Sequence, residues 1–201
     1  MRGAILAIAE LHKSETDPGA KWHVIEFYSR RQRRVTRSTF AAELHGLADS
    51  LEIGKVIAMA YTETQIPGLT PLQLSRKEET GELAIPIHAV IDAKSDFDAL
   101  SVTDIKAPTE ASLIMILLSV KESLLTHSLK YMWWVDTTDM VSDGLTKGAV
   151  PRTALVESGN LGRWLVSKPS VSFSERTHRP TVSINPTWRQ EVLTVLKTKP
   201  E

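Results

Sequence analysis

Apolar residues recur with two spacings along most of the chain. Runs of β-branched and aromatic residues, some alternating with polar ones, occupy segments 3–11, 22–29, 83–91 and 129–135, and this pattern predicts strands. Segment 14–19 reads Ser-Glu-Thr-Asp-Pro-Gly, which is a strong turn signal. We therefore expect the first two segments to form a hairpin.

Helical spacing covers the intervening segments. Apolar residues three and four apart predict a helix that begins at Ser38 or Thr39, is capped by a hydroxyl, and runs to about residue 61. Further helices are predicted over 97–101, 109–125, 140–146 and 151–164, and segment 62–81, which contains Pro67, Gly68 and Pro71, is expected to be a connection with a broken helix. Alternating strands and helices favour an α/β fold.

The strand and helix order also predicts how the strands are arranged. Segments 83–91 and 129–135 should be parallel neighbours, because a helical segment lies between them and such crossovers join parallel strands with a right-handed turn. The hairpin should belong to the same domain as these two strands. We expect this domain to span residues 1–166.

The pattern fails from about residue 167. Segment 167–201 is rich in Pro, Ser and Thr and has little periodicity, although 188–196 is compatible with one exposed helix. Such a composition buries too little apolar area to offset the entropy of ordering the chain. We expect a mostly extended tail that contributes little to the core.

Charge and composition limit the partners of the chain. Lys and Arg together number 24, and so do Asp and Glu together. The chain therefore has no net charge that would attract it to nucleic acid, and any such binding needs a local basic patch. There is no cysteine, which excludes disulfides and thiolate metal sites. The longest apolar run, 113–118, is too short to span a bilayer, and the N-terminus is a poor signal peptide. We expect an intracellular protein, cytoplasmic or nuclear, that is neither secreted nor membrane-bound.

A local basic patch precedes the first long helix. It comprises Arg30, Arg31, Arg33, Arg34 and Arg37. Guanidinium groups bind phosphate oxygens in a bidentate manner, and a helix N-terminus also favours anions. The alternative is a solvated stretch that keeps an exposed strand edge soluble. Carboxylates nearby in the sequence favour contact with a nucleic-acid backbone.

Three carboxylates occupy positions suited to metal binding. Glu43 lies beside the apolar face of its helix, Asp92 ends an apolar strand, and Asp143 lies on the helix after the last strand. Mg²⁺ prefers carboxylate and water oxygens, and two ions about 3.5–4 Å apart can hydrolyse phosphodiesters. Taken singly, each residue also has a structural explanation, as a surface Glu near a helix N-terminus, as an Asp that follows a strand, or as part of an Asp-Gly turn.

Two sequence elements connect these carboxylates to a known family. Ser-Thr-Phe-Ala-Ala-Glu at 38–43 and Val-Ser-Asp-Gly-Leu-Thr-Lys at 141–147, with Asp-Ala at 92–93 between them, resemble the ribonuclease H domain of copia-type retrotransposon polyproteins over about residues 3–164. The resemblance implies a ribonuclease H-like α/β fold, with a mixed sheet flanked by helices. It also implies that Glu43, Asp92 and Asp143 are catalytic residues that converge to bind Mg²⁺ or Mn²⁺.

The resemblance further implies an activity and a partner. Such domains cleave the RNA strand of RNA–DNA hybrids by two-metal hydrolysis, as part of a larger polyprotein. In that family a first catalytic Asp lies on a central strand, just upstream of a segment like 2–8, with which this chain begins. We therefore expect the first strand and its Asp to be missing, and the isolated chain to be a poor nuclease that still binds hybrids weakly and in a salt-sensitive manner.

Two alternatives remain beside this interpretation. One is a catalytically inactive remnant that binds nucleic acid through the arginine cluster, or binds nothing. The other is an unrelated α/β protein of general metabolism, which would need a cofactor signature. The sequence contains neither a Gly-x-Gly-x-x-Gly motif nor a phosphate-binding loop.

Overall fold

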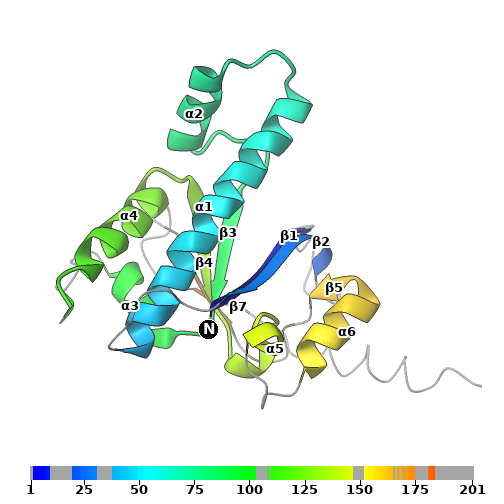
Figure 1. The fold of residues 1–201 in the computed structure, drawn as a ribbon, viewed down its shortest axis with the longest axis vertical. Helices are drawn as coiled ribbons and strands as arrows, with labels where there is room; N and C mark the ends of the chain where they lie inside the picture. Colours follow the sequence, from blue (N-terminus) through cyan, green and yellow to red (C-terminus); the bar gives the residue numbers. More distant parts are fainter. Residues whose placement is uncertain are drawn as a thin grey trace, which may run out of the picture. The chain divides into compact units, whose positions relative to one another are not determined.

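A computed structural model describes most of the chain and gives a mixed α/β structure with two sheets (Figure 1). The described residues are 2–9, 20–30, 38–102, 108, 110–146, 152–164, 166, 168, 170–174 and 181–183. The chain divides into two compact units, unit 1 (Met1–Arg31, Val135–Val171 and Val182–Glu201) and unit 2 (Gln32–Trp134 and Ser172–Thr181). No helix in the described ranges is long and apolar enough to cross a membrane.

The predicted hairpin is confirmed in unit 1. Strands β1 (Arg2–Ala9) and β2 (Ala20–Arg30) pair antiparallel, and the register shifts once, between Leu6 and Ala7. A two-residue strand, β5 (Arg163–Trp164), pairs with the start of β2, so the sheet order is β1-β2-β5.

Short helices follow the last long strand of the chain. They are η1 (Thr137–Asp139), α5 (Asp143–Thr146) and α6 (Thr153–Leu161). The helix predicted over 151–164 ends early, because Gly162 adopts a left-handed conformation with φ 59°, a common way to terminate a helix. The backbone N–H of Trp22 donates to the Gly162 carbonyl at 3.1 Å, which joins β2 to the end of α6.

The beginning of the predicted tail is bound to unit 1. The backbone N–H of Lys168 donates to Oδ2 of the buried Asp139 at 2.9 Å, and its Nζ pairs with Oδ1 of Asp136 at 2.8 Å. The hydrogen bond from Lys168, with those from Thr138, lowers the pKa of Asp136 to about 2. Lys168 therefore has specific partners in the fold.

Helix α1 (Thr39–Gln65) forms one side of unit 2 and is slightly longer than predicted. The predicted cap is confirmed, because Ser38 Oγ accepts a hydrogen bond from the backbone N–H of Ala41 at 3.2 Å. The buried residues of the helix are Ala41, Leu44, Leu47, Leu51, Ala58 and Thr62. They lie on the side that packs against β3, α3 and α4.

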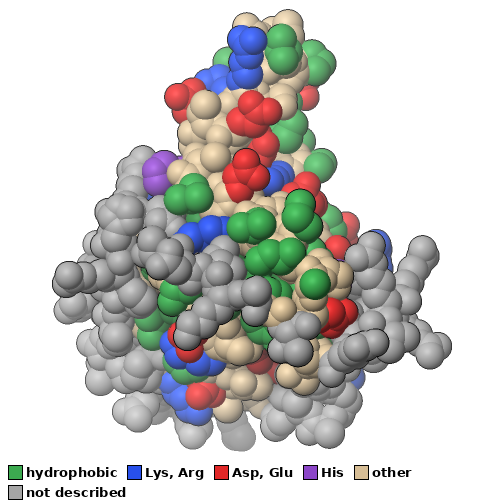
Figure 2. Space-filling model, turned by 90° about the vertical axis from the view of Figure 1, so that its left-hand side faces the viewer, with side chains coloured by type: hydrophobic (Ala, Val, Ile, Leu, Met, Phe, Trp, Pro, Cys, Tyr) green, Lys and Arg blue, Asp and Glu red, His purple; other side chains and the backbone are tan. Residues whose placement is uncertain are grey.

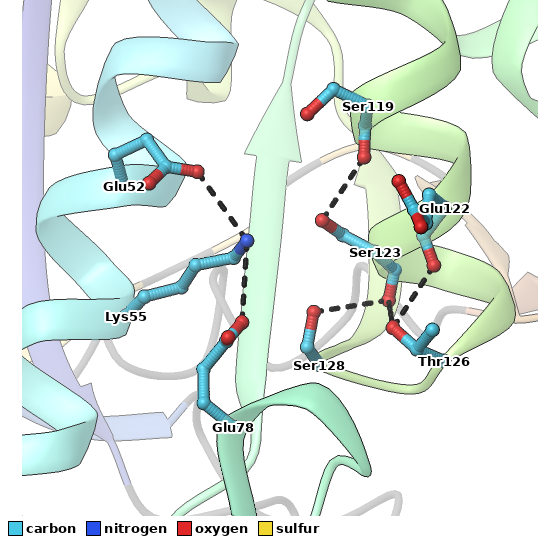
Figure 3. Close-up of polar contacts among 8 residues, drawn as sticks. All are labelled: Glu52, Lys55, Glu78, Ser119, Glu122, Ser123, Thr126 and Ser128. Atoms are coloured by element: carbon cyan, nitrogen blue, oxygen red, sulfur yellow. Dashed lines mark hydrogen bonds and ion pairs between the residues drawn. The ribbon is translucent and has the colours of Figure 1, made fainter. Parts of the chain in front are cut away.

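A second helix, α2 (Pro71–Glu79), occupies the segment predicted as a connection with a broken helix. Thr70 and Gln73 form a capping box, and Pro71 is the first helical residue, where a missing backbone N–H costs nothing. Helix α2 folds back beside the end of α1 (Figure 1). Lys55 on α1 pairs with Glu52 at 3.3 Å and with Glu78 of α2 at 3.2 Å, which joins the two helices (Figure 3).

The second sheet contains the predicted parallel pair. Strand β3 (Ile87–Ile91) runs parallel to β4 (Leu129–Trp134), and α3 (Lys94–Ser101) and α4 (Leu113–Leu125) lie between them in the sequence. This part of the prediction is confirmed. The hairpin lies in the other unit, so its place in a common domain with these strands stays a prediction.

Part of the predicted tail adds to this second sheet. The strand order is β3-β4-β6-β7, where β6 is Ser170–Phe173 and β7 is Thr181–Ser183. Phe173 is buried, and the Lys121 ammonium lies 5.1 Å from its ring centre. The other residues of 175–201, including the possible helix over 188–196, lie outside the described ranges.

The core of unit 2 lies where α3 and α4 pack on β4. The fully buried side chains there are Phe97, Leu100, Leu113, Leu117, Val120, Leu124, Leu129 and Met132. In the last turns of α4, side-chain hydroxyls add hydrogen bonds to backbone carbonyls: Ser123 donates to the Ser119 carbonyl at 3.1 Å, and Thr126 donates to the Glu122 carbonyl at 3.0 Å (Figure 3).

Helix α4 also exposes an apolar stripe. Met115, Leu118 and Leu125 are exposed, and their spacing places them on one face of the helix. Figure 2 shows hydrophobic side chains gathered over the middle of the side of the molecule on which α4 lies.

Thr62 joins α1 to the segment before β3, and its replacement tests that junction. Its buried Oγ1 accepts the backbone N–H of Ala84 at 2.9 Å and donates to the Ala58 carbonyl at 2.7 Å. We expect Thr62→Val to lower the free energy of unfolding by about 1–2 kcal/mol, because the Ala84 N–H loses its acceptor. Urea unfolding followed by circular dichroism measures this change.

Thr64→Val is the matched control for this substitution. Thr64 is exposed on the same helix, and its hydroxyl donates to the Tyr61 carbonyl at 2.6 Å, within α1. Surface substitutions of this kind change stability by about 0.5 kcal/mol or less. Equal effects of the two substitutions would contradict a specific role for Thr62.

Candidate functional site

The three predicted carboxylates are divided between the two units. Glu43 lies near the start of α1 and Asp92 directly follows β3, both in unit 2, whereas Asp143 is the first residue of α5 in unit 1. Glu43 is exposed, Asp92 is half-buried and Asp143 is buried. The predicted convergence can therefore be followed for Glu43 and Asp92, and for Asp143 it stays a prediction.

The position of Glu43 is set by the start of its helix. Capping by Ser38 fixes the first turn, and the buried Ala41 and Leu44 hold one face of α1 against the core. Successive residues of a helix are rotated by about 100°, so Glu43 is directed to the border of that buried face. A carboxylate at this border can reach groups of the neighbouring elements while remaining hydrated.

Asp92 is held by its backbone. The indole N–H of Trp134, the last residue of β4, donates to the Asp92 carbonyl at 2.9 Å. Lys94 follows in α3, where its Nζ pairs with Oδ1 of Asp98 at 2.8 Å and lies 5.2 Å from the Trp134 ring centre. These contacts fix the connection between β3 and α3, at the carboxyl end of a parallel strand, where ligands usually bind in α/β sheets.

The structure adds a further acidic residue, Asp96, which has no distinctive sequence signal of its own. Asp96 lies in the first turn of α3, and only 1% of its surface is exposed. Burial raises its pKa to about 8, and the nearby carboxylates of Glu43 and Asp92 contribute to the increase. Glu43, Asp92 and Asp96 thus form one acidic cluster, built from α1, the end of β3 and α3 in a single unit.

The sequence alone contained a weak signal for Asp96. It lies four residues after Asp92, but an Asp in the first turn of a helix is normally an exposed residue that stabilises the helix dipole. Asp96 is buried because α3 packs against α1. Figure 1 shows α3 beside the first turns of α1. This packing is a tertiary feature that local spacing does not encode.

The donor chemistry of the acidic cluster fits a hard divalent cation. Its side chains offer only carboxyl oxygens, which suit Mg²⁺ and Mn²⁺. Oδ1 of Asp96 is buried and has no hydrogen-bond partner among the described residues. Within the same part of the chain, no three His, Asp or Glu side chains are already arranged to hold a metal ion. A bound cation would therefore require reorientation, which the exposed Glu43 side chain allows.

The arginine cluster is described only at its first residue. Arg30 is the last residue of β2 in unit 1, and its guanidinium lies 5.3 Å from the ring centre of Tyr28. It is exposed, which is compatible with contact to phosphates. Arg31, Arg33, Arg34 and Arg37 lie outside the described residues.

Comparison with known proteins gives no match: no protein-family model, no curated protein and no solved structure matches this chain.

Proposed function

We propose that this chain is a ribonuclease H-like domain that acts on RNA–DNA hybrids, with low hydrolytic activity as an isolated chain. The observation that carries the proposal is the acidic cluster. Glu43 and Asp92 were selected from the sequence as metal ligands, and both act electrostatically on the same buried carboxyl group, that of Asp96. The parallel β3–β4 pair, with helices packed on it, supports a fold of this kind.

The proposal gives each group a chemical role. Glu43 and Asp92 would hold divalent cations, which supply charge stabilisation and an activated water for attack on a phosphodiester. Asp143 would complete the set from unit 1, as the resemblance implies. Arg30 and the arginines that follow it would bind the phosphate backbone, since hybrid duplexes are recognised mainly by shape and backbone. An RNA–DNA hybrid is the expected partner, and the chain is expected to act as part of a larger polyprotein.

A cleavage and binding assay tests this function. The purified chain is incubated with a labelled RNA–DNA hybrid and Mg²⁺ or Mn²⁺, beside Glu43→Gln. The control is Glu63→Gln, an exposed position of the same helix, 20 residues from Glu43 and hence roughly 30 Å away along its axis. We expect slow cleavage that Glu43→Gln abolishes and Glu63→Gln leaves unchanged, together with binding that weakens as salt increases.

The same assay separates the alternatives. Hybrid binding without any cleavage in either metal would favour the inactive remnant that binds through the arginine cluster, which the exposed Arg30 supports. Absence of both binding and cleavage would refute the proposed function. Robust cleavage would refute the expectation of low activity, and would mean that these carboxylates suffice.

A further inference from the structure

The position of Asp96 is unusual for an acidic residue. Ala93 caps α3 without any side-chain hydrogen bond, and Asp96 lies in the first turn, where an acidic side chain would ordinarily point to solvent and stabilise the helix dipole. Here the side chain is buried beside Phe97 and Leu100, which form part of the core. Burial of a carboxyl group is costly unless it has a partner.

Among the residues that the structure describes, no cationic side chain pairs with Asp96. The lysine nearest in sequence, Lys94, pairs instead with Asp98, the next exposed carboxylate of α3. Oδ1 of Asp96 accepts no hydrogen bond from the described residues. Buried polar groups of native proteins are satisfied in the great majority of cases, and exceptions often mark a site for an ion or ligand.

The surroundings of Asp96 indicate which ligand would satisfy it. Glu43 from α1 and Asp92 from the end of β3 both act electrostatically on its carboxyl group, so three acidic residues from three elements lie near one another. A neutral donor could satisfy one oxygen, whereas a divalent cation could neutralise several carboxylates together. Asp96 is also the most rigidly placed of the three, because burial restricts its side chain.

We propose that Asp96 is a further cation ligand of this site, which anchors a Mg²⁺- or Mn²⁺-binding set formed with Glu43 and Asp92 within unit 2. The inference deepens the proposed function and rests on it for the role of the cation. It concerns three carboxylates of unit 2, so its test does not depend on where Asp143 lies. Asp92 and the exposed Glu43 would turn toward the fixed Asp96 when the cation binds.

Calorimetric titration with Mn²⁺, in the absence of nucleic acid, tests the inference. The full chain is compared with Asp96→Asn, which keeps the shape of the side chain, and with Asp98→Asn, an exposed position of the same helix. We expect Asp96→Asn to weaken Mn²⁺ binding by roughly tenfold or more, and Asp98→Asn to leave it unchanged. Unchanged binding by Asp96→Asn, or no binding by the unmodified chain, would overturn the inference.

A second measurement needs no substitution, in case Asp96→Asn fails to fold. Bound Mn²⁺ broadens the nuclear magnetic resonance signals of nearby amides. We expect broadening of the amides of Glu43, Asp92 and Asp96, and broadening confined to other regions would overturn the inference. The chain could bind Mn²⁺ through Asp96 and yet neither cleave nor bind hybrids. That result would refute the proposed function and support the cation site.

Discussion

Replacing Asp96 by asparagine should remove a loss of stability that the protein undergoes between about pH 4 and pH 8 in the absence of divalent cations. The pKa of Asp96 is raised from 3.8 to about 8, first by burial and then by the carboxylates of Glu43 and Asp92. Between these two values the folded protein retains a proton on Asp96 that the unfolded chain has released. The free energy of unfolding therefore falls as pH rises through this window, and the dependence ends above the folded pKa.

The expected size of this effect is large for a single group. A pKa unit corresponds to about 1.4 kcal/mol, so the full shift would correspond to about 6 kcal/mol. Relaxation and water penetration reduce the cost of a buried charge, so we expect Asp96→Asn to gain roughly 2–4 kcal/mol over the unmodified protein between pH 4 and pH 8. Urea unfolding at a series of pH values, with a chelator present, gives the difference directly. Asp98→Asn is the control, because Asp98 is exposed. Parallel pH profiles of the unmodified protein and Asp96→Asn would contradict the assignment.

The effect of Asp96 is measured as a difference between variants, because His88 changes the free energy of unfolding with pH in the opposite direction. Burial and the nearby Lys130 lower the pKa of His88 from 6.5 to about 4. The unfolded chain then binds a proton that the folded protein does not, so His88 destabilises the fold as pH falls from 6.5 toward 4. This contribution is the same in both proteins and cancels in their difference.

The sequence predicted the elements with strong local signals. Alternating apolar residues and a turn signal predicted the β1–β2 hairpin, and the Ser38 hydroxyl predicted the start of α1. The parallel β3–β4 pair followed from the helical segment between them. These features depend on neighbouring residues in the chain, which is why spacing sufficed.

Two features were predicted only in part. Segment 62–81 was predicted as a connection with a broken helix, and the structure places α2 there: Pro71 at its first position favours the helix, and the Thr70–Gln73 capping box completes the start. The tail from 167 had no periodicity, yet Phe173 is buried and Lys168 bonds to Asp139. Single long-range contacts of this kind leave no periodic pattern.

The candidate site was also predicted only in part. Glu43 and Asp92 were selected because each follows a recognisable helix start or strand end. Asp96 was missed because its burial depends on how α1 packs against α3, which local spacing does not contain. The relation of Asp143 to the acidic cluster depends on the arrangement of the two units and stays a prediction of the resemblance.

Replacing Gly81 by alanine should destabilise unit 2 strongly. Gly81 has φ +67°, and a Cβ placed there would lie 2.6 Å from the carbonyl oxygen of His127 and 2.7 Å from its carbonyl carbon. The left-handed conformation alone costs an alanine about 1–2 kcal/mol. The clash is with backbone, in a turn where His127 itself has φ 63°, so it cannot be relieved by a side-chain rotation. We expect a total loss of about 3 kcal/mol or more.

Gly68→Ala separates these two contributions. Gly68 lies at the other end of α2 and also has a positive φ, +88°, but nothing lies within 4 Å of the position its Cβ would take. Its replacement should therefore cost only the conformational part, about 1–2 kcal/mol. Denaturant unfolding of the two variants gives the comparison. If Gly81→Ala were no more destabilising than Gly68→Ala, the segment before β3 would not pack against the turn between α4 and β4. A larger loss at Gly81 would establish that these two segments, far apart in the sequence, lie in close contact within the unit that carries the acidic cluster.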